Sequence, residues 1–137
     1  MEQYVVKKLS CSWVLTAAHC VYGKTGAGLS LLAGDHDVRA RERGEQRRDV
    51  CRVTTHPHYG SRSIRDDLGL LRVCRPFVFS MYVQPLPLPR PQYAAAGGQA
   101  VMVAGWGAVR EQGKTAGKLR YSIRSSFRSR FKILRRI

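Results

Sequence analysis

The chain has 137 residues, which is enough for one ordinary domain with a moderate core. Lysine and arginine total 24 against 9 aspartates and glutamates, and the formal net charge of +15 allows attraction to polyanions but gives no information about the fold. No apolar run reaches the roughly 20 residues that a membrane helix needs, and the polar start from Met1 to Ser10 lacks the apolar core of a signal peptide.

The stretch from Trp13 to Cys20 (WVLTAAHC) is the most informative part of the sequence. Val14 and Leu15 are typical of the end of a buried strand, and the small Thr-Ala-Ala step after them predicts a tight turn. Such a turn would hold His19 at the surface. A single histidine is more often structural than catalytic, so its interpretation depends on residues further along the chain.

A strand is predicted over residues 28–33, and a charged loop follows from Gly34 to Gln46. One interpretation is a solvated loop with scattered acids. The other is a loop that binds a hard cation through carboxylate oxygens and backbone carbonyls, opposed by three arginines in the same segment. The carboxylates would come from Asp35, Glu42 and Glu45.

Two further strands are predicted over residues 47–54 and 68–73, joined across a stretch that contains His56 and His58. His56 precedes a proline, which favours an extended backbone. We expect both histidines to be loop residues that cap local backbone groups. Asp67, directly before the second of these strands, is by itself typical of a turn.

Prolines at 85, 87, 89 and 91 predict an extended connector, because proline denies hydrogen bonds to a strand ladder. A proline-rich ligand for an SH3-type groove is the alternative. A last strand is predicted over residues 99–104, and it leads into Gly105-Trp106-Gly107, where the glycines let the backbone turn around a packed indole.

The last sixteen residues, Ser122 to Ile137, hold six lysines or arginines and no acid. Their apolar residues recur at helical spacing, which indicates a basic amphipathic helix. The alternative is an unselected segment without function. The apolar residues are Ile123, Phe127, Phe131, Leu134 and Ile137.

The sequence resembles the trypsin-like (chymotrypsin-fold) serine endopeptidases in three motifs and in their order. These motifs are WVLTAAHC, the Asp-Leu-Gly-Leu-Leu that begins at Asp67, and Gly105-Trp106-Gly107. The resemblance covers Leu9 to Leu119 and implies an all-β fold of two packed β-barrels. This chain would hold an incomplete first barrel (9–84), the connector (85–91) and the opening strand of the second barrel (92–119), which would have no partner strand. Residues 1–8 would be a non-family start and 120–137 a basic tail of unrelated sequence.

By this resemblance His19 is the general base of a Ser-His-Asp triad and Asp67 the acid that orients it. No nucleophile is assigned, because the family's Gly-Asp-Ser-Gly-Gly stretch, which supplies the serine and the oxyanion hole, has no counterpart in this sequence. The resemblance implies a secreted, monomeric endopeptidase that acts on proteins or peptides and requires no cofactor. This chain alone would be inactive.

The alternative function is a non-catalytic basic fragment that binds a polyanion, nucleic acid without sequence specificity, or a membrane surface.

The resemblance also adds Asp37 and Ala40 to the cation loop, as backbone-carbonyl ligands of a structural calcium ion shared with Asp35, Glu42 and Glu45.

The resemblance places the strands 47–54 and 68–73 side by side and antiparallel. Cys51 and Cys74 would then either form a disulfide or remain as two buried thiols. Cys20 has lost its usual partner, whose position falls on Tyr4. A bond from Cys20 to Cys11 is disfavoured, because the strand between them would hold their Cα atoms beyond the limit of about 7 Å for a disulfide.

Overall fold

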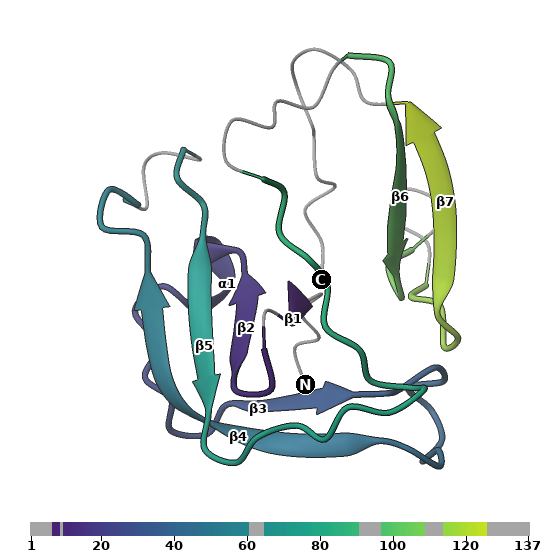
Figure 1. The fold of residues 1–137 in the computed structure, drawn as a ribbon, viewed down its shortest axis with the longest axis horizontal. Helices are drawn as coiled ribbons and strands as arrows, with labels where there is room; N and C mark the ends of the chain where they lie inside the picture. The colour runs from purple at the N-terminus through teal and green to yellow at the C-terminus, as the bar shows by residue number, and fades with distance from the viewer. Residues whose placement is uncertain (1–6, 9, 61–64, 91–96, 109–113, 126–137) are drawn as a thin grey trace. The chain divides into compact units, whose positions relative to one another are not determined.

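The structure is a computed structural model that describes residues 7–8, 10–60, 65–90, 97–108 and 114–125. These residues form two units (Figure 1). The first unit comprises the described residues of Tyr4–Asp35 and Glu42–Leu88, and the second those of His36–Arg41 and Pro89–Ile137.

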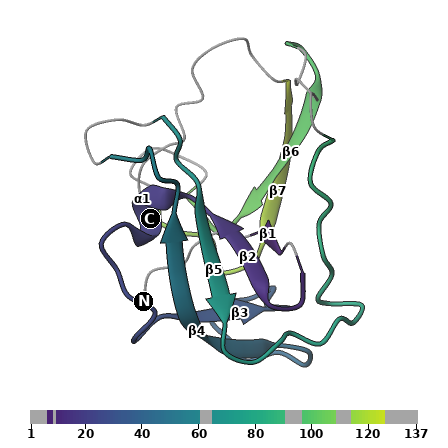
Figure 2. The same cartoon turned by 60° about the vertical axis from the view of Figure 1, so that its left-hand side comes forward.

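The first unit is a five-stranded antiparallel sheet in the order β1-β2-β5-β4-β3. Figure 2 shows β2, β5 and β4 side by side. The five strands are β1 (Lys7–Lys8), β2 (Trp13–Thr16), β3 (Ser30–Ala33), β4 (Gln46–Thr55) and β5 (Gly69–Val73). Four of these strands were predicted from sequence, and the all-β class is confirmed, with one helical turn, α1 (Ala18–Val21), as the only helix in the described residues.

Strand β4 pairs with a different neighbouring strand along each part of its length. Its first residues pair with β3, up to Asp49 opposite Ser30, and its later residues pair with β5. Figure 1 shows β4 bending from the direction of β5 to run beside β3, so that the sheet curls into part of a barrel. The ladder with β5 shifts between Val50 and Arg52, which leaves Cys51 as the extra residue of a bulge.

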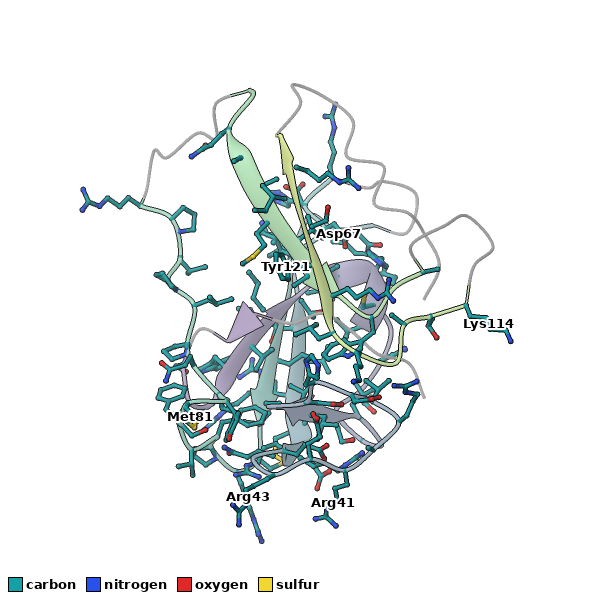
Figure 3. All side chains as sticks on the ribbon, turned by 90° about the vertical axis from the view of Figure 1, so that its right-hand side faces the viewer. Arg41, Arg43, Asp67, Met81, Lys114 and Tyr121 are labelled. Carbon is teal, nitrogen blue, oxygen red and sulfur yellow. A yellow bond between two sulfur atoms is a disulfide. The ribbon has the colours of Figure 1, made fainter. Side chains whose placement is uncertain are left out.

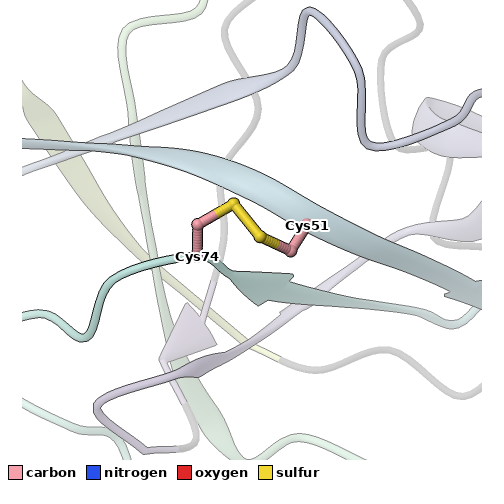
Figure 4. The surroundings of a disulfide bond; sticks show 2 residues. All are labelled: Cys51 and Cys74. Carbon is pink, nitrogen blue, oxygen red and sulfur yellow. A yellow bond between two sulfur atoms is a disulfide. The ribbon is translucent and has the colours of Figure 1, made fainter.

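The bulge carries a disulfide between Cys51 and Cys74, whose Cα atoms are 5.0 Å apart (Figure 4). The Cys74 N–H also donates to the carbonyl of Asp49 at 2.9 Å, which continues the pairing past the end of β5. Of the two alternatives left by the sequence, the structure therefore has the bonded one, and both residues are exposed rather than buried. Cys11 and Cys20 form no disulfide within the described chain.

Replacing both Cys51 and Cys74 by alanine should lower the free energy of unfolding. The bond joins residues with a sequence separation of 23, and the chain-entropy relation gives a cost of about 3.4 kcal/mol for a loop of that size. Urea denaturation of oxidised wild type and the double variant measures the difference. A Cys11→Ser variant is the matched control and should unfold like wild type; equal stability of all three would contradict the prediction.

The first unit has a hydrophobic core to which strands and the helical turn both contribute. Val14, Leu71 and Val21 are its largest fully buried side chains, and they come from β2, β5 and α1. The buried residues of this cluster are Val14, Val21, Leu31, Val50, Leu71, Val73, Phe77 and Val83. The core thus ties α1 to strands β2 and β5, which fixes the helix that carries His19.

Gly26 is a position where the fold has no room for a side chain. A Cβ atom there would lie 2.5 Å from the carbonyl oxygen of Val50 and 3.0 Å from the carbonyl carbon of Cys51. The same loop is tied to β4 by the Val50 N–H, which donates to the carbonyl of Leu29 at 3.0 Å. Only a glycine therefore lets the loop approach the bulge of β4 so closely.

Gly26→Ala should destabilise the first unit by about 1–3 kcal/mol, because the added methyl group forces backbone away from backbone. Gly60→Ala is the control, since a Cβ there meets nothing within 4 Å and Gly60 has no positive φ. Thermal unfolding of the two variants separates steric conflict from the general effect of removing a glycine. A Gly26→Ala protein as stable as the Gly60→Ala protein would contradict the described packing.

The second unit contains a β-hairpin-like pair, β6 (Ala100–Gly105) and β7 (Arg120–Ser125), in antiparallel register from Ala100 opposite Ser125 to Gly105 opposite Arg120. Strand β6 agrees with the prediction over 99–104. The expectation that this strand has no partner is wrong, because residues assigned to the basic tail supply one. The helical prediction is also wrong for residues 122–125, whereas 126–137 lie outside the described residues.

The indole of Trp106 is a fixed point of the second unit. The indole Nε1–H donates to the backbone carbonyl of His36 at 3.1 Å, and the Trp106 backbone carbonyl accepts from the N–H of Ala116. The pair β6–β7 leaves Met102, Tyr121 and Ile123 largely exposed, and Tyr121 is labelled on β7 in Figure 3. Met102 and Ile123 are directly opposite each other, so they lie on one face of the pair.

Candidate functional site

His19 lies at the surface because Ala18 and Val21 of the same helical turn face the core. Strand β2 ends at Thr16, Ala17 keeps an extended backbone, and the helical turn α1 follows from Ala18 to Val21. Ala18 and Val21 are 0% and 1% exposed, whereas the His19 side chain is 49% exposed. The predicted tight turn is therefore a single turn of helix, and its small and apolar residues bury while the imidazole between them faces outward.

Asp67 lies at the same end of the β2–β5 pair as His19. Strands β2 and β5 are antiparallel, with Thr16 opposite Gly69, so the end of β2 and the start of β5 share one edge of the sheet. The residue before it, Asp66, has a positive φ of 56°, a conformation that aspartate tolerates better than most residues. This backbone turn directs Asp67 towards α1.

The absence of a side chain at Gly69 lets α1 pack closely against β5. A Cβ atom there would lie 3.0 Å from Val21 Cγ2 and 3.2 Å from Thr16 Cγ2. A glycine by itself weakens a strand slightly. The structure adds a positive reason for it, because close packing of Val21 brings the helix that carries His19 near the carboxylate of Asp67.

One carboxylate holds His19 by two hydrogen bonds. Asp67 Oδ1 accepts from the backbone N–H of His19 at 2.8 Å, and Asp67 Oδ2 lies 2.7 Å from His19 Nδ1. Partial burial alone would raise the pKa of Asp67, but hydrogen bonds from the His19 backbone and ring and from the Ala18 backbone outweigh it and lower the pKa. Asp67 is therefore ionised at neutral pH.

The ionised carboxylate determines which nitrogen of His19 carries the hydrogen. A carboxylate only accepts hydrogen bonds, so Nδ1 must be the donor, and the neutral ring keeps its lone pair on Nε2. This tautomer is the one that can take a proton from a hydroxyl group placed beside Nε2. The pair is an oriented general base with an exposed ring.

A nucleophile is not part of this arrangement in the described residues. The hydroxyls of Ser10 and Ser30 are hydrogen-bonded to Trp13 and Arg47, close to their own positions in the sheet. No serine hydroxyl of the described chain is hydrogen-bonded to the His19 ring. The structure thus brings His19 and Asp67 together and supplies no third member of a triad among these residues.

The predicted carboxylates of the cation loop do converge. One carboxylate oxygen from each of Asp35, Glu42 and Glu45 lies within 4.8 Å of the others, and all three residues are half-buried. The N–H of Glu42 donates to Glu45 Oε1 at 2.7 Å. The exposed Arg43 side chain points away from the loop (Figure 3), so its charge is directed towards solvent.

Asp37 and Ala40 belong to the second unit, and their role as carbonyl ligands stays a prediction. The Asp37 carboxylate binds the Arg39 guanidinium at 2.8 and 2.6 Å, and this hydrogen bond holds the pKa of Asp37 well below its usual range. The Asp37 carbonyl accepts from the N–H of Ala40 at 3.0 Å. Arg39 is therefore neutralised by its own neighbour.

Sequence reasoning missed a second convergence of candidate ligands. His56, His58 and Asp66 each place one ligand atom within 4.8 Å of the others. The expectation that these histidines cap local backbone agrees with one contact, since the His58 N–H donates to His56 Nδ1 at 3.3 Å. The available signal was the His-Pro-His triplet, but nothing in the sequence places it against Asp66.

Comparison with known proteins gives a consistent result for both sequence and fold. The family model described as Trypsin matches residues 9–132, which extends past Leu119 into β7. Vitamin K-dependent protein C of Mus musculus is 38% identical over 111 residues, and kallikrein-15 of Homo sapiens is 39% identical over 101 residues; each alignment covers 74% of this chain.

A solved structure titled "Structure of GrC" superposes with a TM-score of 0.78 at 30% identity. The superposed region covers 86% of this chain and 50% of the chain in that structure. The chain also spans 24% of protein C and 37% of kallikrein-15. It therefore corresponds to a part of each of these proteins.

Proposed function

The chain belongs to the trypsin family of serine proteases, and on this premise we propose that it carries the His–Asp part of a serine endopeptidase active site. The observation that supports the proposal best is the pair of hydrogen bonds from His19 to one carboxylate of Asp67, at 2.8 and 2.7 Å. His19 is the general base, and Asp67 holds its ring in the tautomer with a free Nε2.

The chemistry follows the Ser-His-Asp mechanism of this family. His19 Nε2 takes the proton of a serine hydroxyl as that oxygen attacks a peptide carbonyl, and later gives the proton to the leaving amine. Asp67 stays ionised and stabilises the imidazolium. The nucleophile and the oxyanion hole must come from a segment equivalent to Gly-Asp-Ser-Gly-Gly, so the 137 residues alone are proposed to be inactive.

Completing the active site tests this assignment. The chain is joined to the serine-bearing C-terminal segment of a family member, and amide hydrolysis is measured with short peptide substrates. The completed protein should be active, His19→Ala should abolish activity, and His36→Ala, which changes a histidine of the other unit, should not. Activity that survives His19→Ala in a folded protein would contradict the assignment of the base.

We extend the proposal to a structural calcium ion held by Asp35, Glu42 and Glu45. Trypsin-like proteases need no cofactor for the reaction, so such an ion would stabilise the loop rather than take part in the chemistry. The donor set fits, because three converging carboxylate oxygens are hard ligands of the kind that calcium prefers.

Family membership also supports a secreted enzyme that acts as a monomer on protein or peptide substrates, with the Cys51–Cys74 disulfide suited to an oxidising compartment. No helix in the described residues is long and apolar enough to cross a membrane.

The high positive charge supports a second function, binding to polyanions. The chain carries 24 basic residues against 9 acidic ones, and association dominated by such charge releases counterions from the partner. Binding to heparin, measured between about 50 and 200 mM salt, should weaken by about 10-fold or more if several basic residues contact the polyanion. An affinity independent of salt would contradict this function.

A further inference from the structure

A cluster of two histidines and one aspartate lies in the first unit, and its aspartate, Asp66, directly precedes Asp67. His56 and His58 offer one ring nitrogen each and Asp66 one carboxylate oxygen, and these three atoms lie within 4.8 Å of one another. His58 and Asp66 are exposed and His56 is half-buried, so an ion from solvent can reach the cluster. Neither the calcium loop nor the His19–Asp67 pair uses any of these side chains.

The two histidines are held by a tight turn. The N–H of Tyr59 donates to the carbonyl of His56 at 3.0 Å, which closes a four-residue turn with Pro57 in its second position, where proline is favoured. The ring of Tyr59 packs edge-on against Tyr22, with ring centroids 5.2 Å apart. The backbone that carries the two histidines is therefore held in place before any ligand binds, which reduces the entropic cost of binding.

The turn is joined directly to the segment that carries Asp66. The N–H of His56 donates to the carbonyl of Leu68 at 2.8 Å, and the N–H of Leu68 donates to the carbonyl of Asp66 at 2.7 Å. Asp66 is the only non-glycine residue with a positive φ in the described chain, at 56°. These bonds explain how ligands from two separate loops converge, and Asp66 is the residue directly before Asp67.

The donor set selects the class of ion. Imidazole nitrogen suits zinc and its transition-metal neighbours, whereas calcium and magnesium prefer oxygen alone. Ligand atoms of a tetrahedral zinc ion, at about 2.0–2.2 Å from the metal, lie about 3.3–3.6 Å apart. The present upper limit of 4.8 Å requires only small side-chain rotations. Displacing the long bond from His58 N–H to His56 Nδ1, at 3.3 Å, would cost little.

We propose that His56, His58 and Asp66 form a binding site for a zinc-class divalent transition metal, with water in the remaining position. A bound ion would link the His56–Tyr59 turn to the Asp66 backbone turn and so restrain the segment that presents Asp67. The bound ion would position that turn and would take no part in the chemistry. It rests on the geometry of three side chains and not on the proposed protease function.

Zinc titration of the full 137-residue chain by calorimetry tests the proposal, with excess calcium present to occupy oxygen-only sites. Wild type should bind one zinc ion, and His58→Gln and Asp66→Asn should each weaken binding at least about tenfold. Asparagine tolerates a positive φ, so Asp66→Asn removes the charge while keeping the backbone turn. His36→Gln, which removes a histidine of the other unit, is the matched control and should bind like wild type.

Two further readouts distinguish this site from a thiolate site and from a loss of folding. Cobalt(II) bound in place of zinc should show no thiolate charge-transfer absorption, because imidazole and carboxylate are the ligands; such an absorption would assign the ion to Cys11 or Cys20 and overturn the proposal. Circular dichroism of each variant checks that the fold is retained. Unchanged zinc affinity in a folded His58→Gln or Asp66→Asn protein would also overturn it.

Discussion

A fluorophosphonate probe is expected to leave the purified 137-residue chain unlabelled. Such probes react with a serine whose hydroxyl is activated by a base and whose product is stabilised by an oxyanion hole. His19 and Asp67 supply the base, with a hydrogen bond of 2.7 Å between the ring and the carboxylate. No Gly-Asp-Ser-Gly-Gly segment is present in the sequence to supply the rest.

Labelling of this chain should be nearly absent, and not merely weaker, in comparison with a complete trypsin-like enzyme. The activity that survives removal of triad members in this family, about 10³–10⁴-fold over the uncatalysed reaction, depends on an oxyanion hole and a substrate site. A complete trypsin-like enzyme serves as positive control, and His19→Ala as the matched variant. Labelling of the wild-type chain that disappears in His19→Ala would show that another serine of this sequence occupies the position of the nucleophile.

Asp67→Asn should lower kcat by about 10⁴-fold once the chain is completed with a serine-bearing segment, the magnitude known for the equivalent substitution in this mechanism. An asparagine amide can still accept from the His19 backbone N–H through its oxygen. Its NH₂ group would then face His19 Nδ1, which must become the acceptor. The ring proton would move to Nε2, where the base needs a lone pair.

The effect should fall on kcat, with KM nearly unchanged, because the substitution alters the base and not the binding of substrate. Nitrogen-15 NMR of His19 provides a direct check, since the protonated ring nitrogen should change from Nδ1 to Nε2 in the variant. Asp49→Asn, which removes a carboxylate on β4, is the control and should retain full activity. A comparable loss in Asp49→Asn would indicate a general electrostatic or folding effect.

The sequence determined the fold class, four strands of the first sheet and the two residues of the candidate site. Local patterns were sufficient for the strands, because alternating apolar residues and the turn residues between them specify strand segments directly. His19 and Asp67 were found through WVLTAAHC and Asp-Leu-Gly-Leu-Leu, and not through any property of an isolated histidine or aspartate. Sequence patterns failed at the C-terminal side, where helical spacing in residues 122–125 gave way to strand pairing with β6.

Only the tertiary structure decided how distant residues meet. Antiparallel pairing of β2 with β5 brings Thr16 opposite Gly69, and this register places His19 beside Asp67 across 48 residues of sequence. The bulge at Cys51 likewise decided that its thiol bonds to Cys74.

The sequence shows His56 and His58 close together but gives no sign that Asp66 lies beside them, because that contact depends on the hydrogen bond from the His56 N–H to the Leu68 carbonyl. Periodicity encodes which face a residue takes within its own strand, whereas contacts between strands and loops depend on register and close packing.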